Sequence, residues 1–203
     1  MCFRIFVGAL TVLLPEYSAT QEWFEYVSPT DRFGVNFPNK PEIQELTYNS
    51  EYDRHFPARV YTALDEESPY SVTVVDFRDA QQIHDEGSIR WLYDQRASVA
   101  RAARQFREQA ANVTWDAWGH VEHVEGHQLQ MTNPDGSRSF VGIYFHGQVG
   151  YLYILEATVP STAPPPGQFQ NSLNFLDEEG GRVRYRLEPD GSTTRIIYSV
   201  DPQ

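Results

Sequence analysis

Short runs of β-favouring residues recur along most of this 203-residue chain, and turn-forming residues separate them. Phe33, Val35 and Phe37 alternate with small or polar residues, which is typical of a strand with one buried face. Residues 70–77 carry apolar side chains at odd and even positions, so we expect a central strand covered on both faces. Further strands are expected at 23–27, 43–48, 58–64, 112–132, 137–147, 149–160 and 182–200. The pattern predicts a sheet whose strands are joined largely by hairpins.

Two segments instead show helical spacing. Between residues 88 and 110, apolar residues such as Leu92, Val99 and Phe106 recur on one face of a helix. A second, shorter stripe consists of Phe169, Leu173 and Leu176. Together with the strands, these segments predict an α+β domain, in which a largely antiparallel sheet carries a long helix and a short C-terminal helix packed on it.

Residues 1–20 have the features of a secretory signal peptide. Arg4 precedes the apolar run Ile5–Leu14, whose ten residues are too few to span a bilayer. Pro15 ends the run, and small residues follow it. We therefore expect a periplasmic or secreted bacterial protein, with residues 21–203 forming a single soluble domain and no membrane span after signal removal. The alternative is that the segment forms a buried N-terminal strand or helix.

The only cysteine, Cys2, lies inside this expected signal peptide. The mature chain would then contain no disulfide, no thiolate metal site and no cysteine nucleophile. Its fold would have to be held together by packing alone.

The opening of the expected domain resembles a known family. The residues that carry the likeness are a tryptophan, a Tyr-x-Ser-Pro and a Phe-x-Val-x-Phe-Pro-x-x-Pro: Trp23, Tyr26, Ser28, Pro29, Phe33, Val35, Phe37, Pro38 and Pro41. This pattern resembles the PsbP-like and DcrB-like exported bacterial proteins, most closely uncharacterised alphaproteobacterial ones, and the likeness covers most of residues 22–178. The resemblance implies an antiparallel sheet with helices packed against it and a role in docking to larger assemblies. It implies no catalytic residue.

The charge of the chain is acidic, with a net value of −12. An acidic balance argues against nucleic-acid binding, which requires basic residues to neutralise phosphates. Two stripes of arginine are basic regions in this acidic chain, one on the expected helix and one on the strand sequence RVRYR. Their members are candidates for binding an acidic protein partner or a small ligand: Arg90, Arg101, Arg104, Arg182, Arg184 and Arg186. The alternative is that nearby acidic residues neutralise them on a solvated face.

Three histidines lie close together in the sequence GHVEHVEGH. On a helix, His120, His123 and His127 would share a face suited to a metal ion. The neighbouring residues favour strands, and on a strand His120 and His123 point to opposite faces. A periplasmic metal-binding protein is therefore the alternative function, and exposed strand polarity is the competing interpretation.

Motifs for catalysis do not stand out in the sequence. It contains neither a nucleophile elbow of the form G-x-S-x-G nor a phosphate-binding glycine loop. No cofactor is implied. We expect a non-catalytic binding or assembly module, with an unrecognised hydrolase as the weakest alternative.

Overall fold

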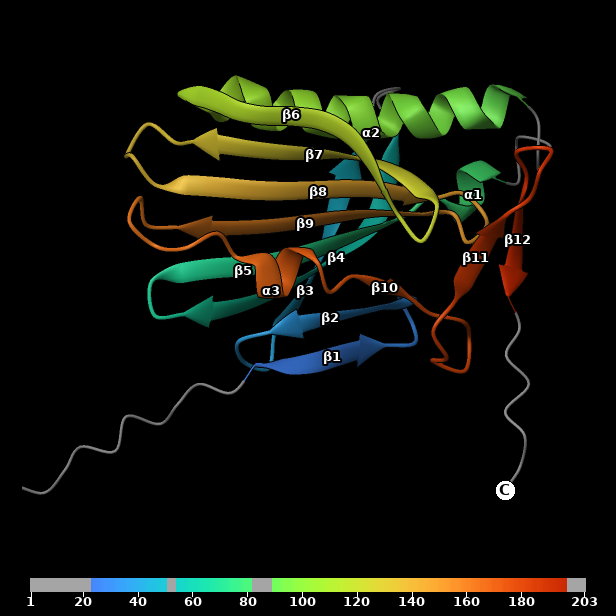
Figure 1. Cartoon of the computed structure of the whole chain (residues 1–203), viewed down its shortest axis with the longest axis horizontal. Coiled ribbons are helices and arrows are strands. Elements are labelled where there is room, and N and C mark those ends of the chain that lie inside the picture. Colours follow the sequence, from blue (N-terminus) through green and yellow to red (C-terminus); the bar gives the residue numbers. More distant parts are fainter. Residues whose placement is uncertain (1–22, 51–53, 82–88, 197–203) are drawn as a thin grey trace, which may run out of the picture.

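The fold is built on a large antiparallel sheet. The computed structural model describes residues 23–50, 54–81 and 89–196. Within them, seven strands pair in the order β3-β4-β5-β9-β8-β7-β6 (Figure 1). Their bounds are β3 Glu42–Asn49, β4 His55–Asp65, β5 Ser68–Asp76, β6 Asn112–Val121, β7 Val124–Thr132, β8 Arg138–His146 and β9 Tyr151–Val159. Strands β5 and β9, distant in the chain, pair at the centre.

A smaller sheet and a helix cover opposite faces of this large sheet. The smaller sheet consists of β1 Phe24–Ser28, β2 Phe33–Phe37 and β10 Asn174–Phe175, in the order β1-β2-β10. Together with the short helix α3, Gly167–Gln170, it packs on one face through buried aromatic residues such as Phe33 and Phe169. Helix α2, Ile89–Gln109, lies on the other face, where Val99 and Ala103 meet Leu129.

Strand β5 shows why the sequence pattern leads to this layering. Val72 and Val74 join the core beneath the smaller sheet, whereas Val75 joins the core beneath α2. The two-sided apolar pattern of residues 70–77 thus confirms the prediction of a central strand, because β5 lies between β4 and β9. Buried apolar area on both faces supplies the main driving force for folding.

The α+β class expected from the sequence is wrong. The structure is mostly β, with 55% strand and 15% helix. Apart from α2, the helices within the described residues are α1, Arg78–Gln81, and α3, each of four residues. The stripe of Phe169, Leu173 and Leu176 forms no C-terminal helix beyond Gln170, since the chain then extends into β10. Its apolar spacing arises because the side chains of Phe169 in α3, Leu173 in the following loop and Leu176 just after β10 are all buried in the core.

Two further hairpins complete the described fold. Strands β6 and β7 are joined by the turn residues Glu122 and His123, whose φ angles of 47° and 64° are those of a tight hairpin turn. Strands β11, Arg184–Leu187, and β12, Thr193–Ile196, form a separate two-stranded sheet at one end of the molecule (Figure 1).

Helix α2 is amphipathic rather than uniformly apolar. Among the helices of the described residues, none combines the length and the hydropathy that crossing a bilayer requires. The expected signal peptide, residues 1–20, lies outside the described residues.

Candidate functional site

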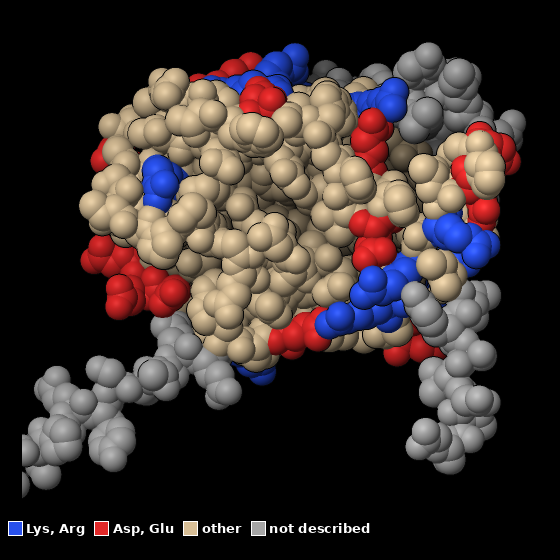
Figure 2. All heavy atoms as spheres, viewed as in Figure 1, with Lys and Arg blue, Asp and Glu red and all other residues tan. Residues whose placement is uncertain are grey.

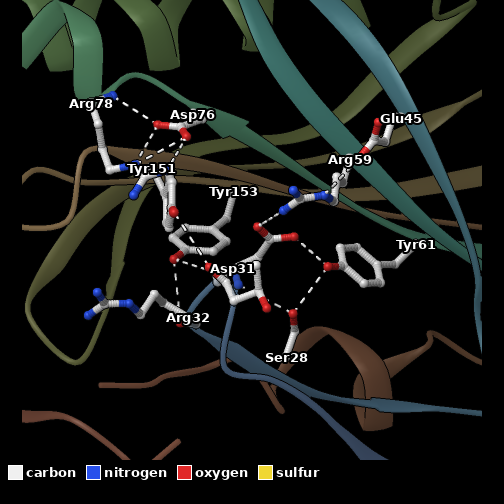
Figure 3. A network of polar contacts seen from close by, with 11 residues as sticks. Ser28, Asp31, Arg32, Glu45, Arg59, Tyr61, Asp76, Arg78, Tyr151 and Tyr153 are labelled. Atoms are coloured by element: carbon white, nitrogen blue, oxygen red, sulfur yellow. Dashed lines mark hydrogen bonds and ion pairs between the residues drawn. The ribbon is translucent and has the colours of Figure 1, made fainter. Parts of the chain in front are cut away.

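A groove of about 480 Å³ lies beside the turn that joins β1 to β2. It is lined by this turn, by β3, β4 and β5, and by Arg78 and Tyr151. We call it the two-arginine groove, because Arg59 and Arg78 face it together with the carboxylates of Asp31 and Asp76 (Figure 3). A cleft with several converging polar groups is the usual form of a ligand site.

Asp31 anchors one side of this groove. It belongs to the β1–β2 turn and is 4% exposed. Its Oδ1 accepts a hydrogen bond of 2.6 Å from Nη1 of Arg59, and its Oδ2 accepts one from the hydroxyl of Tyr61 (Figure 3). Ser28 Oγ lies 3.1 Å from the Tyr61 hydroxyl and accepts a hydrogen bond from the Asp31 amide. Both oxygens of the buried carboxylate are thus satisfied, as a buried charge requires.

The backbone of the turn is held from the large sheet. The hydroxyl of Tyr153 donates to the carbonyl of Asp31 at 3.0 Å, and that of Tyr151 donates to the carbonyl of Thr30 at 3.5 Å. Burial raises the pKa of both tyrosines, so their hydroxyls stay protonated and able to donate. The turn is therefore fixed in position by side chains of β9.

Arg59 connects the turn to strand β4. The negative charge of Asp31 raises the pKa of its guanidinium, which stays charged. Its Nε also lies 3.6 Å from Oε1 of Glu45, a side chain that is 82% exposed. Within the described residues, Nη2 of Arg59 makes no hydrogen bond. This nitrogen remains available to a ligand.

Arg78 forms the other side of the groove. Its Nε and Nη2 donate to the carboxylate of Asp76, with the Nη2–Oδ2 distance 2.6 Å. Its guanidinium carbon lies 5.3 Å from the ring centroid of Tyr151, a cation–π contact. Burial opposes ionisation of Asp76, but the hydrogen bonds from Arg78 outweigh it and lower the pKa. In the described part of the chain, no hydrogen bond uses Nη1 of Arg78.

Most polar side chains of the groove are bonded to one another. The hydroxyls of Ser28 and Tyr61 are buried and bonded to one another, and burial raises the pKa of Tyr61 far above its usual value. His55 is bonded through Nδ1 to Asn49 at 2.5 Å. None of the described groove residues pairs an accessible nucleophile with a base. The two guanidinium groups, by contrast, are oriented and retain free donors.

The three histidines do not converge. His120 lies on β6 and His123 is the second residue of the β6–β7 turn, and their rings stack with centroids 5.9 Å apart. The expectation that these two point to opposite faces is therefore wrong, because His123 belongs to a tight turn and not to a strand, so strand alternation does not apply to it. Among the described residues, no group of three histidine, cysteine or acidic side chains is placed to hold a metal ion.

His127 is separated from the other two and belongs to a polar cluster in which its own side chain is buried, whereas those of Arg107 and Asp116 are partly exposed. Its Nε2 contacts Oδ1 of Asp116, and Arg107 donates to both oxygens of that carboxylate, with Nε 2.6 Å from Oδ2. The hydrogen bond from Arg107 contributes most to lowering the pKa of Asp116 to about 2. The cluster ties the end of α2 to β6 and β7.

The six candidate arginines lie on different elements. Arg101 and Arg104 are on α2, while Arg184 and Arg186 are on β11 at the end of the molecule. Arg90 is in α2, but its side chain lies outside the described residues. Four candidates pair with acids: Arg104 with Glu108, Arg182 with Glu25, Arg184 with Glu122 and Arg186 with Glu188. In these pairs, nearby acidic side chains neutralise the charge of the arginines. Binding of a partner by the two arginine stripes stays a prediction.

Sequence reasoning missed the groove. The sequence SPTD indicates a turn, which is where Asp31 lies, and Asp76 is the last residue but one of the expected strand 70–77, two residues before Arg78. The sequence feature that could have indicated the groove is an acidic residue near the end of an apolar strand, followed closely by an arginine. Nothing local to the sequence places Arg59 beside Asp31.

The chain matches no protein-family model and no curated protein. The resemblance to the PsbP-like and DcrB-like proteins accordingly remains a prediction.

Proposed function

We propose that this protein is an exported, non-catalytic binding module whose two-arginine groove receives a carboxylate or phosphate group of a small ligand. The observation that carries the proposal is the pair of fixed guanidinium groups, Arg59 and Arg78, each with a terminal nitrogen that no described residue uses. The signal-peptide pattern of residues 1–20 supports export.

The acids of the groove support binding of an anion rather than a cation. Asp31 and Asp76 already accept hydrogen bonds from the two arginines, so their oxygens are largely used. Because each guanidinium is held by its own acid, a ligand need not order a flexible side chain on binding. Preorganisation of this kind reduces the entropic cost of association. The guanidinium group of arginine stays charged, and its N–H groups form strong hydrogen bonds to carboxylate and phosphate groups.

The geometry favours a small ligand over a large surface contact. The groove volume of about 480 Å³ lies within the usual range for small-molecule sites. Tyr151 adds an aromatic wall beside Arg78. The ligand would lie with its anionic group toward the guanidinium edges and its remainder along β3 and β4.

Titration with citrate, inorganic phosphate and N-acetylglutamate, followed by NMR of the arginine Nε–H resonances, tests the proposal. Binding should shift the resonances of Arg59 and Arg78. Arg78→Gln should weaken binding about tenfold or more, because a charge-assisted hydrogen bond to the ligand is lost. Arg104→Gln, which changes an exposed arginine on α2, is the matched control and should bind as the parent does. Absence of any shift with all three anions, or equal binding by both variants, would refute the proposal.

A further inference from the structure

A second hollow lies on the face of the large sheet that also carries α3. Figure 2 shows this hollow near the centre of the view, with neither basic nor acidic side chains at its walls. It is lined by Trp115, Gln128, Gln130, Tyr144, Gln170 and Asn171. We call it the neutral hollow. Its enclosed part is small, about 50 Å³, so a ligand would insert one group and lie across the rim.

Two glycines shape the floor of the neutral hollow. A Cβ atom at Gly126 would come within 2.2 Å of Cδ1 of Tyr144, and one at Gly142 would lie 3.0 Å from its Cε2. The ring of Tyr144 therefore occupies space that side chains of β7 and β8 would otherwise fill. Its hydroxyl accepts a hydrogen bond of 2.8 Å from Nε2 of Gln128. The floor is thus rigid and already hydrogen-bonded.

The rim offers unused polar groups without charge. Within the described residues, the side-chain amides of Gln130, Gln170 and Asn171 make no hydrogen bond. Each amide presents both donors and an acceptor, which matches hydroxyl groups that also donate and accept. Trp115 also lines the hollow and is 53% exposed, so a ligand can reach its ring.

We propose that the neutral hollow binds an uncharged oligosaccharide. The ring face of one sugar packs on Trp115, and its hydroxyl groups bond to the amides of Gln130, Gln170 and Asn171. An uncharged ligand suits a site without ionic side chains in a chain of net charge −12. The hollow opens on the face of the sheet, so a bound ligand contacts side chains. It does not contact the backbone of edge strand β6, with which an added peptide strand would pair. The site is separate from the two-arginine groove and does not rest on its ligand.

Calorimetric titration with maltohexaose, cellohexaose and chitohexaose, three neutral chains of different linkage, tests this inference. At least one should bind, and Trp115→Ala should weaken that binding about tenfold, because a stacking contact is lost. Trp118→Ala is the matched control, since Trp118 lies on the same strand and is similarly exposed at 49% but does not line the hollow. It should change the affinity by less than about twofold.

A second variant separates hydrogen bonding from stacking. Gln170→Ala removes one rim amide from α3 and should weaken binding without altering unfolding by urea. Arg78→Gln should leave sugar binding unchanged, which distinguishes this site from the two-arginine groove. Failure of all three sugars to bind, or equal losses in the Trp115 and Trp118 variants, would overturn the inference.

Discussion

Asp31 and Arg59 form an ion pair, with Nη1 2.6 Å from Oδ1, that joins the β1–β2 turn to strand β4 of the large sheet. The carboxylate is buried, whereas the guanidinium is 38% exposed and reaches the two-arginine groove. The same contact therefore holds the two sheets together and orients a candidate ligand-binding side chain.

Asp31→Asn should lower the free energy of unfolding by about 1–3 kcal/mol, because Arg59 and Tyr61 lose a charged acceptor. Urea unfolding followed by circular dichroism measures the change. Glu45→Gln, which alters an exposed acid 3.6 Å from the same guanidinium, should change stability by less than about 1 kcal/mol. Equal effects of the two substitutions would contradict the importance assigned to the buried pair.

His146 should make stability depend on pH. It is 3% exposed, and burial contributes most to lowering its pKa to about 4 from 6.5. Its neighbours include Tyr185, whose hydroxyl lies 3.0 Å from Nε2, and Arg32, whose charge adds to the lowering. A lowered pKa means that the unfolded chain binds the proton more readily between these two values.

The stabilising contribution of His146 to the free energy of unfolding is therefore fully present above pH 6.5, and it is lost as the pH falls toward 4. The free energy of unfolding should fall by about 2 kcal/mol from this residue between pH 7 and pH 5. Urea unfolding at both values measures the loss, and His146→Gln should remove most of it. His55→Gln, at an exposed position, should keep the dependence of the parent. The same fall in all three proteins would show that other groups cause it.

Glu156 should destabilise the protein at neutral pH. It lies on central strand β9 opposite Val141 of β8, and burial raises the pKa of its carboxyl. A raised pKa means that stability falls as the pH rises from the unfolded value through the folded one. Glu156→Gln should therefore raise the urea concentration at the midpoint of unfolding at pH 7. At pH 4 the variant should be no more stable than the parent. Glu67→Gln, in the exposed β4–β5 turn, should leave the midpoint unchanged.

Gly126 and Gly119 are paired across β6 and β7, but only one of them should tolerate alanine. A Cβ at Gly126 would lie 2.2 Å from the backbone oxygen of Ile143, whereas one at Gly119 would meet Gln128 at an ordinary 3.5 Å. Gly126→Ala should cost about 3 kcal/mol or more through overpacking, and Gly119→Ala less than about 1 kcal/mol. Thermal unfolding compares them directly, and similar melting temperatures would be the contrary result.

Strand positions were largely readable from the sequence because alternation of side chains is a local property. The pattern of residues 70–77 predicted the central strand β5 correctly. The same reasoning failed at Phe169, Leu173 and Leu176, since spacing alone does not distinguish a helix from a bent chain that fills a core. It also placed His120 and His123 on opposite faces, because the turn formed by Glu122 and His123 was not recognised.

The sequence by itself determined that the chain forms many strands, that one segment is helical and that its charge is acidic. Only the tertiary structure decided which polar groups meet. Asp31 and Arg59 are 28 positions apart, and Arg32 and Glu178 are 146 apart, so no local pattern connects them. The groove and the neutral hollow exist because non-adjacent strands pair and a second layer packs on them. Such long-range contacts are set by the packing of the whole core and not by the periodicity of any one segment.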